Sequence, residues 1–255
     1  MKYTLATTVN GQLLLTMLSE KLMNIPNVQL IQINTDGVTV YIHKDSIKQY
    51  YNVCKEWELI TNLQLEYANY KLMVIRDVNN YLSVYDNGKY KCKGAFEFEN
   101  IPLHKNKSHS IIPKAVYEYF VNGKSIEDTI LNHKNIFDFC GGVRARKTDK
   151  KGASWYELRS IQGSDIKKEK LSKTVRYYVS KKGKWLFKCY EDGSYAHVEA
   201  PLNLGKMKKD WKVTYFNKAY FLDNFEDYGI DYVFYIHSAR TIINNIEPQN
   251  QLKLL

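Results

Sequence analysis

The residues best suited to chemistry in this chain lie in the stretch LIQINTDGVTVYI, residues 30–42. Asp36 and Gly37 stand there between two runs of strand-forming residues, a pattern typical of a β-hairpin. An aspartate raised on such a turn loses little side-chain entropy when its carboxylate holds Mg²⁺ together with substrate phosphates. Asp-Gly is equally the ordinary pair of a tight turn. The stretch alone therefore leaves a metal site and a purely geometric turn both open.

The hairpin makes two further predictions. Glycine supports a tight turn, and Gly37 would also let a nucleic-acid strand or another backbone pass close by. The apolar residues of each run are expected to lie on one face of their strand: Leu30, Ile31 and Ile33 in the first run, and Val38, Val40 and Ile42 in the second.

Positive charge is concentrated in one third of the chain. The 255 residues carry a formal net charge of +10, with a pI of about 9.2. Between Arg144 and Lys188 there are 15 Lys and Arg against 4 Asp and Glu. Five aromatic residues lie among these cations: Trp155, Tyr156, Tyr177, Tyr178 and Trp185. Cations neutralise phosphates and aromatic faces stack on bases, so the segment favours nucleic-acid contact, with a merely soluble surface over core aromatics as the alternative.

The first part of the chain reads as helix, hairpin, helix and further strands. Apolar spacing predicts an amphipathic helix over 11–24, which Asn27 ends, and a second over 46–62 with Asp45 as its N-cap. Strands are predicted over 63–77, 80–86 and 89–98, with a tight turn at 86–88. The fold class is therefore predicted as α+β: an antiparallel sheet with packed helices, then a mixed region of helices and strands.

The second part begins after a predicted linker at 105–110. Helices are predicted over 113–123 and 125–132, because Pro113 and Ser125 supply starts and Gly123 a stop. Short strands with turns at KKGK (181–184) and EDGS (191–194) follow, and a final helix spans 231–247. The predicted domains are 1–104 and 105–255.

Several classes of protein are disfavoured. Polar residues interrupt the N-terminal segment, so it lacks the apolar stretch of a signal peptide, and no run is long enough to span a bilayer. The cysteines are scattered, which favours reduced thiols in a cytoplasmic protein over a zinc site or a disulfide framework. They are Cys54, Cys92, Cys140 and Cys189. No membrane partner is expected.

Four ordered segments carry a family resemblance. QINTDGVTVYI resembles the palm hairpin of family B DNA polymerases, which usually reads Tyr-Gly-Asp-Thr-Asp-Ser and in the phage branch also Asn-Thr-Asp-Gly. Residues 5–22 resemble the palm helix before that hairpin, and 227–247 resemble the closing thumb segment of phage members. Residues 76–84 and 89–96 resemble the segment that reads Lys-Lys-Arg-Tyr and then Lys-Gly. The resemblance covers most of the chain and is weakest across 140–215.

The resemblance assigns roles to single residues. Asp36 matches the second, metal-binding Asp of the motif, and Asn34 stands where the first, less critical Asp would be. It further implies that a set of residues contacts primer–template DNA. This set comprises Asn34, Thr35, Gly37, Arg76, Tyr81, Lys91, Lys93 and Gly94, and the basic third adds Arg144, Arg146 and Lys147. Tyr81 as strand core, and Lys91 and Lys93 as a solvated face, are the alternatives.

Essential parts of a polymerase are missing. Two-metal nucleotidyl transfer needs a second carboxylate and cations for the incoming dNTP. In the family these lie in an Asp-x-x-Ser-Leu-Tyr-Pro segment and on the fingers helix, and neither is present. The chain is therefore expected to be the C-terminal palm and thumb portion, a split subunit or a truncated product, with another chain supplying exonuclease, fingers and the rest of the Mg²⁺ site. The alternative is a non-catalytic DNA-binding protein derived from such a fragment.

The last residues resemble a clamp-binding peptide. Bacterial and phage replication proteins hold a sliding clamp through Gln-Leu-x-Leu-Phe, and this chain ends Gln251, Leu252, Lys253, Leu254, Leu255. The resemblance implies a sliding clamp as a further partner, with Leu255 in place of Phe. A frayed terminus is the alternative.

Overall fold

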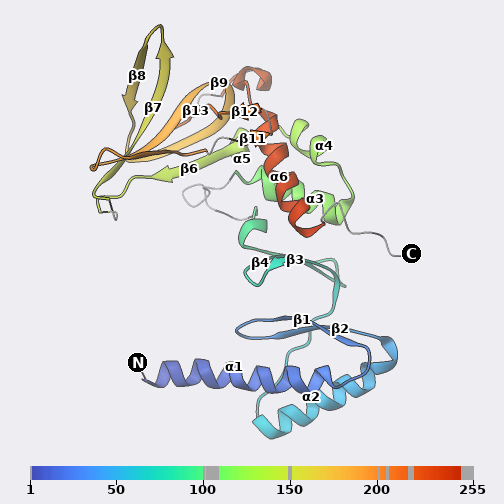
Figure 1. The fold of residues 1–255 in the computed structure, drawn as a ribbon. Coiled ribbons are helices and arrows are strands. Elements are labelled where there is room, and N and C mark those ends of the chain that lie inside the picture. Colours follow the sequence, from blue (N-terminus) through green and yellow to red (C-terminus); the bar gives the residue numbers. More distant parts are fainter. Residues whose placement is uncertain are drawn as a thin grey trace. The chain divides into compact units, whose positions relative to one another are not determined.

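The computed structural model describes residues 2–99, 101, 109–148, 151–199, 202–204, 207–217 and 221–247. The chain divides into two compact units, residues 1–90 (unit 1) and 91–255 (unit 2). Helices and antiparallel sheets occur in both, which confirms the predicted α+β class (Figure 1). The tail residues Gln251, Leu252, Leu254 and Leu255 lie outside the described residues. Among the described residues, no helix is long and apolar enough to cross a membrane.

Unit 1 packs a hairpin on two helices. Its elements are α1 (Lys2–Met23), β1 (Val28–Ile33), β2 (Val38–Ile42), the 3₁₀ turn η1 (Lys44–Ser46), α2 (Ile47–Thr61), β3 (Tyr70–Asp77) and β4 (Asn80–Tyr85). The core cluster consists of Leu18, Leu22, Ile25, Cys54 and Trp57, with Val28, Val38 and Val40 of the hairpin packed against it. The indole Nε1 of Trp57 donates to the Leu14 carbonyl at 2.9 Å, which joins α2 to α1.

Two details of unit 1 differ from the predictions. The first helix begins at Lys2 rather than at residue 11, so the Thr-rich segment before Gly11 belongs to the same helix. Asp45 does not cap α2. It lies inside η1, where its backbone N–H donates to His43 Nδ1 at 3.4 Å, and Ser46 occupies the N-cap position.

The sheet β3–β4–β5 follows, and the division between the units falls within β5 (Tyr90–Lys93). The predicted turn at 86–88 is confirmed: Gly88 has a φ of 79°, and the Tyr85 N–H donates to the Lys89 carbonyl at 2.8 Å. The segment 63–69, predicted as strand, is irregular, and β3 begins only at Tyr70.

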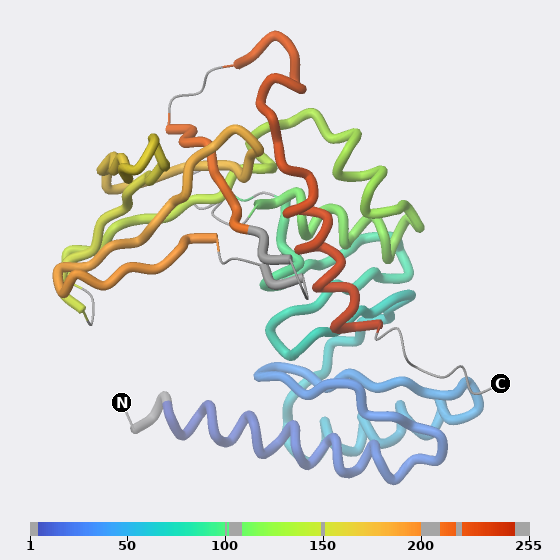
Figure 2. The backbone as a smooth tube through the Cα atoms, turned by 45° about the horizontal axis from the view of Figure 1, so that its top comes forward, coloured from blue at the N-terminus to red at the C-terminus, as the bar shows by residue number. Residues whose placement is uncertain are grey.

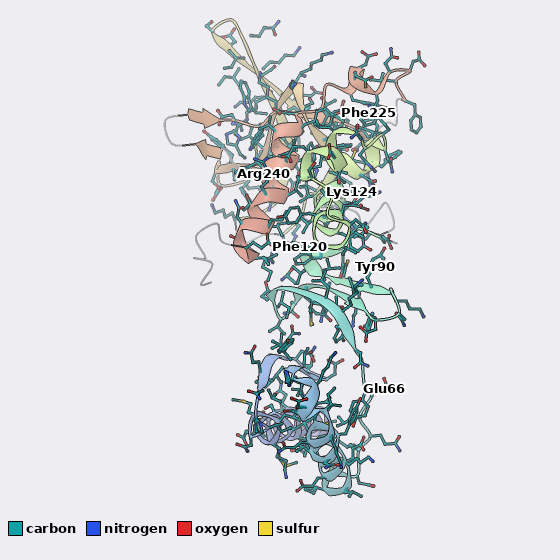
Figure 3. All side chains as sticks on the ribbon, turned by 90° about the vertical axis from the view of Figure 1, so that its right-hand side faces the viewer. Glu66, Tyr90, Phe120, Lys124, Phe225 and Arg240 are labelled. Atoms are coloured by element: carbon teal, nitrogen blue, oxygen red, sulfur yellow. The ribbon has the colours of Figure 1, made fainter. Side chains whose placement is uncertain are left out.

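Unit 2 combines helices with a six-stranded antiparallel sheet. Its elements are η2 (Gly94–Phe96), α3 (Ile111–Asn122), α4 (Ile126–Leu131), α5 (Ile136–Phe139), β6 (Cys140–Arg144), β7 (Ser154–Gln162), β8 (Asp165–Lys170), β9 (Thr174–Tyr190), β10 (Tyr195–His197), β11 (Leu202–Leu204), β12 (Met207–Lys209), β13 (Val213–Tyr215), η3 (Phe225–Tyr228) and α6 (Tyr232–Ile246). Helix α6 packs on α3 and α4. Arg240 of α6, labelled in Figure 3, forms an ion pair with Glu127 at 2.6 Å.

Strand β9 organises the sheet of unit 2. Its first half pairs with β6 and β13, and its second half pairs with β7 and β10, so one curved strand serves two groups of neighbours (Figures 1 and 2). The turn predicted at KKGK (181–184) is therefore wrong, because these residues continue the strand. Gly183 permits the close approach of β13, since any Cβ there would overlap the backbone of Val213. The turn at EDGS is confirmed, with Gly193 at a φ of 80°.

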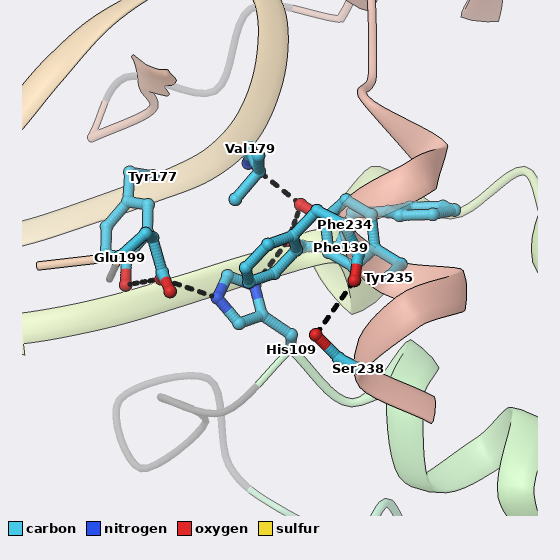
Figure 4. Close-up of polar contacts among 8 residues, drawn as sticks. All are labelled: His109, Phe139, Tyr177, Val179, Glu199, Phe234, Tyr235 and Ser238. Atoms are coloured by element: carbon cyan, nitrogen blue, oxygen red, sulfur yellow. Dashed lines mark hydrogen bonds and ion pairs between the residues drawn. The ribbon is translucent and has the colours of Figure 1, made fainter. Parts of the chain in front are cut away.

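The described part of the predicted linker is buried rather than exposed. His109 and Ser110 are 7% and 4% exposed. His109 Nδ1 lies 2.9 Å from the Phe139 carbonyl, and Nε2 lies 3.1 Å from Glu199 Oε1 (Figure 4). The Tyr177 hydroxyl donates to the same carboxylate oxygen. Polar composition predicts solvent exposure for this segment, but partners far away in sequence satisfy its polar groups inside the core.

Candidate nucleic-acid interface

The hairpin turn holds Asp36 in the exposed position that the sequence predicts. The Asn34 N–H donates to the Gly37 carbonyl at 3.0 Å, and the Asp36 N–H donates to the Asn34 side-chain oxygen at 3.1 Å. Asn34 thus stabilises the turn through its side chain, as short polar residues commonly do. Thr35 and Asp36 are exposed at the tip. The turn fixes the backbone of Asp36 and leaves its carboxylate accessible.

Gly37 is less constrained than predicted. Its φ is not positive, and a Cβ on it would meet only the Asn34 side-chain oxygen, at an ordinary 3.7 Å. The turn geometry therefore does not require glycine at this position. Because Gly37 has no side chain, it still leaves room beside Asp36 for a nucleic-acid strand or another backbone, as the sequence suggested.

The faces of the hairpin differ from the predicted ones. A register shift between Leu30 and Gln32 accompanies an outward Ile31 and Ile33, which are 44% and 36% exposed, while Gln32 is 7% exposed. Side chains alternate between the two faces of a strand. Ile31 and Ile33 therefore lie on the face opposite to Leu30, and Gln32 lies on the same face as Leu30. Val38 and Val40 of β2 pack inward as expected.

Asp36 could supply one carboxylate ligand for a cation. Among the described residues, no group of three or more His, Cys, Asp or Glu side chains is placed to hold a metal ion. A single exposed carboxylate suits Mg²⁺, which binds through one or two carboxylates together with substrate phosphates and water. Asp36 therefore fits one carboxylate position of such a site, and the described residues do not gather further ligands into a group of three or more.

The segments predicted to contact primer–template differ in how available they are. Tyr81 is 6% exposed in β4, so its ring is strand core, the alternative reading of this residue. Arg76 Nε lies 3.2 Å from Asp77 Oδ2, and the hydrogen bonds of Asp77 to the Asn80 amide and the Asn79 N–H help to lower its pKa. A phosphate contact by Arg76 would have to compete with this pair.

Residues around β5 keep an open surface. Lys91 and Gly94 are exposed, and Lys93 is half-buried. Gly94 has a φ of 63°, a conformation that favours glycine, and its N–H donates to Glu97 Oε1 at 3.1 Å. The Lys-Gly pair of the resemblance therefore stands at a real backbone bend, where β5 passes into η2.

A group of cations lies in unit 2 at the end of β6. Arg144, Arg146 and Lys147 are exposed around an open groove of about 520 Å³. Lys173 joins them because β6 pairs with the start of β9, and the Ala145 N–H donates to the Lys173 carbonyl at 2.8 Å. No acidic residue is among the described residues that line the groove. We call these four residues the basic groove.

Sequence reasoning missed Lys173 as a member of this group, although its charge counts toward the basic third. The only sequence signal is its position before a β-rich run, and pairing with β6 cannot be deduced from that. Three of the five aromatic residues noted in the basic third cannot stack on bases, because Tyr156, Tyr177 and Tyr178 are only 4–5% exposed. Trp155 and Trp185 remain partly exposed.

Comparison with family models, curated proteins and solved structures finds no match to this chain.

Proposed function

We propose that this chain is the C-terminal palm and thumb part of a family B DNA-directed DNA polymerase, working as a split subunit in phage DNA replication. Asp36 carries the proposal: it is an exposed carboxylate on a hairpin turn, in a segment whose sequence resembles the palm motif. When bound, Mg²⁺ stabilises the charge that develops on the phosphates of the primer end and the dNTP. Asp36 would hold that ion from one side.

A second chain is required by this proposal, to supply the other carboxylate, the fingers and the exonuclease. Helix α1 offers a surface that supports such a partner. Leu5, Val9 and Leu13 follow one another at intervals of four, on one side of the helix, and are 67%, 42% and 61% exposed. Large apolar side chains gathered in this way commonly mark protein interfaces.

The basic groove would hold the duplex by its phosphates. Arginine and lysine contacts of this kind set affinity and register without reading sequence. Replacing Arg144, Arg146 and Lys147 by Gln should reduce the slope of log affinity against log salt by about 2.7 on duplex DNA, since each phosphate contact contributes about 0.9. Replacement of Lys48 and Lys55, two exposed lysines of α2, by Gln is the matched control and should leave the salt slope unchanged.

The decisive experiment is primer extension by the complex recovered from the source cells through a tag on this chain. Asp36→Ala should lower extension by about 10³-fold or more, because a metal ligand contributes several kcal/mol to the transition state. DNA binding should barely change. Asp86→Ala is the matched control, since Asp86 is exposed on another hairpin turn. Extension by the purified chain alone, or full activity of the Asp36→Ala complex, would overturn the proposal.

The alternative function is a non-catalytic DNA-binding protein. The basic groove favours it, because all four cations belong to unit 2 and none requires Asp36. A recovered complex that binds DNA but never extends a primer would select this alternative.

A further inference from the structure

One face of the sheet in unit 2 carries an ordered row of rings and cations. Cross-strand partners share a face, so the pairings Trp155–Cys189–Tyr195, Glu157–Phe187–His197, Glu157–Lys170 and Arg159–Lys168 define it. We call the outer residues of this surface the stacking face: Trp155, Arg159, Lys168, Lys170, Tyr195 and His197.

Arg159 is fixed at the centre of the stacking face. Its guanidinium contacts two rings, 4.4 Å from the centroid of Phe187 and 4.5 Å from that of Tyr195, which also meet each other edge-on. Its edge donates to Glu157 Oε2 at 3.2 Å and to Cys189 Sγ at 3.3 Å. Cation–π stacking and the ion pair together hold the group rigid. Arg159 therefore holds one face of the Tyr195 ring, and its own charge is paired with Glu157.

Three rings on the stacking face are at least partly exposed: Tyr195, Trp155 and His197. Tyr195 is 60% exposed even though Arg159 and Phe187 contact it. The partly exposed ring of Trp155 lies under the Lys170 ammonium at 5.1 Å, and its Nε1 donates to Glu157 Oε1 at 2.8 Å. His197 lies over Phe187, with 4.2 Å between the ring centroids. Flat surfaces held in fixed orientations can stack with little loss of entropy.

The charge on this face selects an anion. Strand β8 is exposed along its whole length and presents Lys168 and Lys170 on the stacking face. The acidic residue between them, Glu169, belongs to the opposite face and pairs with Lys184 at 2.9 Å. Glu157, the carboxylate on this side, is already bonded to Trp155 and Arg159. The two lysines are therefore the charges that this side of β8 offers to a partner.

We propose that the stacking face binds an unpaired nucleic-acid strand. Bases stack on Tyr195 and Trp155, and Lys168 and Lys170 contact the phosphates. Exposed rings combined with cations are the general means of holding single strands without sequence preference. A duplex cannot use these rings, because its bases are stacked on one another. The basic groove, by contrast, offers cations around a buried tyrosine. The inference does not rest on the proposed polymerase function, since no residue of the Asp36 hairpin enters it.

The test compares affinities for a labelled oligothymidine and for a hairpin duplex of similar charge, by fluorescence anisotropy. Tyr195→Ala should weaken single-strand binding by about 5- to 150-fold, the range for losing one base–aromatic stack, and leave duplex binding within about twofold. Tyr195→Phe keeps the ring and should bind as the native protein does. Tyr41→Ala is the control, because Tyr41 is 65% exposed but lies on β2 in unit 1.

Two further measurements keep the test independent of folding. Lys168→Gln with Lys170→Gln should reduce the salt slope for the single strand by about 1.4, at about 0.7 per phosphate contact. A bromouracil-substituted oligonucleotide should cross-link to Tyr195 or Trp155. Unchanged affinity in a folded Tyr195→Ala variant, equal losses for duplex and single strand, or cross-links only at other sites would overturn the inference.

Discussion

Gly141 and His109 should depend on each other for stability. Gly141 lies in β6 beneath the imidazole of His109. A methyl group added at Gly141 would stand 2.6 Å from His109 Cε1, 2.7 Å from Nε2 and 3.1 Å from Tyr177 Cζ. The two contacts with His109 are far below van der Waals distance, so Gly141→Ala must displace the ring from its position in Figure 4.

The cost follows from what the ring does there. His109 bonds to the Phe139 carbonyl at 2.9 Å and to the Glu199 carboxylate at 3.1 Å. A charge-assisted hydrogen bond contributes about 1.5–3 kcal/mol and an ordinary one about 0.5–1.5 kcal/mol. Gly141→Ala should therefore destabilise unit 2 by about 2–4 kcal/mol. His109→Ala should cost about 3–5 kcal/mol, because it also leaves a cavity among aromatic rings and a poorly paired carboxylate.

The double variant is the decisive measurement. Without the imidazole, the methyl group added at Gly141 enters vacated space, so Gly141→Ala should then cost almost nothing. Urea unfolding of the two single variants and the double variant, followed by near-ultraviolet circular dichroism, gives the coupling free energy, expected at about 2–4 kcal/mol. Additive losses of unfolding free energy, or no loss for Gly141→Ala in the native background, would refute the inference that the His109 ring packs on Gly141.

Two further predictions concern unit 2. Gly183→Ala should destabilise the sheet by about 3 kcal/mol or more, since the new methyl overlaps the backbone of Val213 and β13 must move; the shift of the urea midpoint measures this. Burial alone raises the pKa of Asp138, but hydrogen bonds from His133 and Ser110 outweigh it and hold the pKa below its usual range. The stability gained is present above the unfolded pKa and is lost as pH falls through the lowered folded value, so Asp138→Asn should flatten the loss of stability measured between about pH 5 and pH 2.

The hairpin at Asp36 was predictable because its signals are local. A polar turn between β-branched runs allows few alternatives, and Asn34 closes the turn through an atom two residues from its partner. Which face of β1 turns inward was not predictable from hydrophobicity, since Gln32 is buried on the side of Leu30 and Ile31 is exposed on the other. Packing on α1 and α2 decides those faces, and a single strand's sequence does not contain it.

The errors in unit 2 have a common cause in contacts between distant residues. Lys-Lys-Gly-Lys has the composition of a turn. Glycine is needed at Gly183 for another reason, because the backbone of Val213, thirty residues later, lies where a Cβ would be. His109 has the surroundings of a linker in the sequence because its partners, Phe139 and Glu199, lie thirty and ninety residues away. Local composition is a sound guide only where local contacts satisfy the polar groups.

The same distinction bears on how this chain would hold DNA. In the segment that resembles the primer–template motif, Tyr81 is buried and Arg76 already has a carboxylate partner. The basic groove has neither restriction, and pairing of β6 with β9 adds Lys173 to its cations. Phosphate contacts need accessible, uncompensated charge more than they need a motif. Duplex affinity should therefore depend on the region where the resemblance is weakest, and the hairpin of Asp36 should matter for synthesis alone.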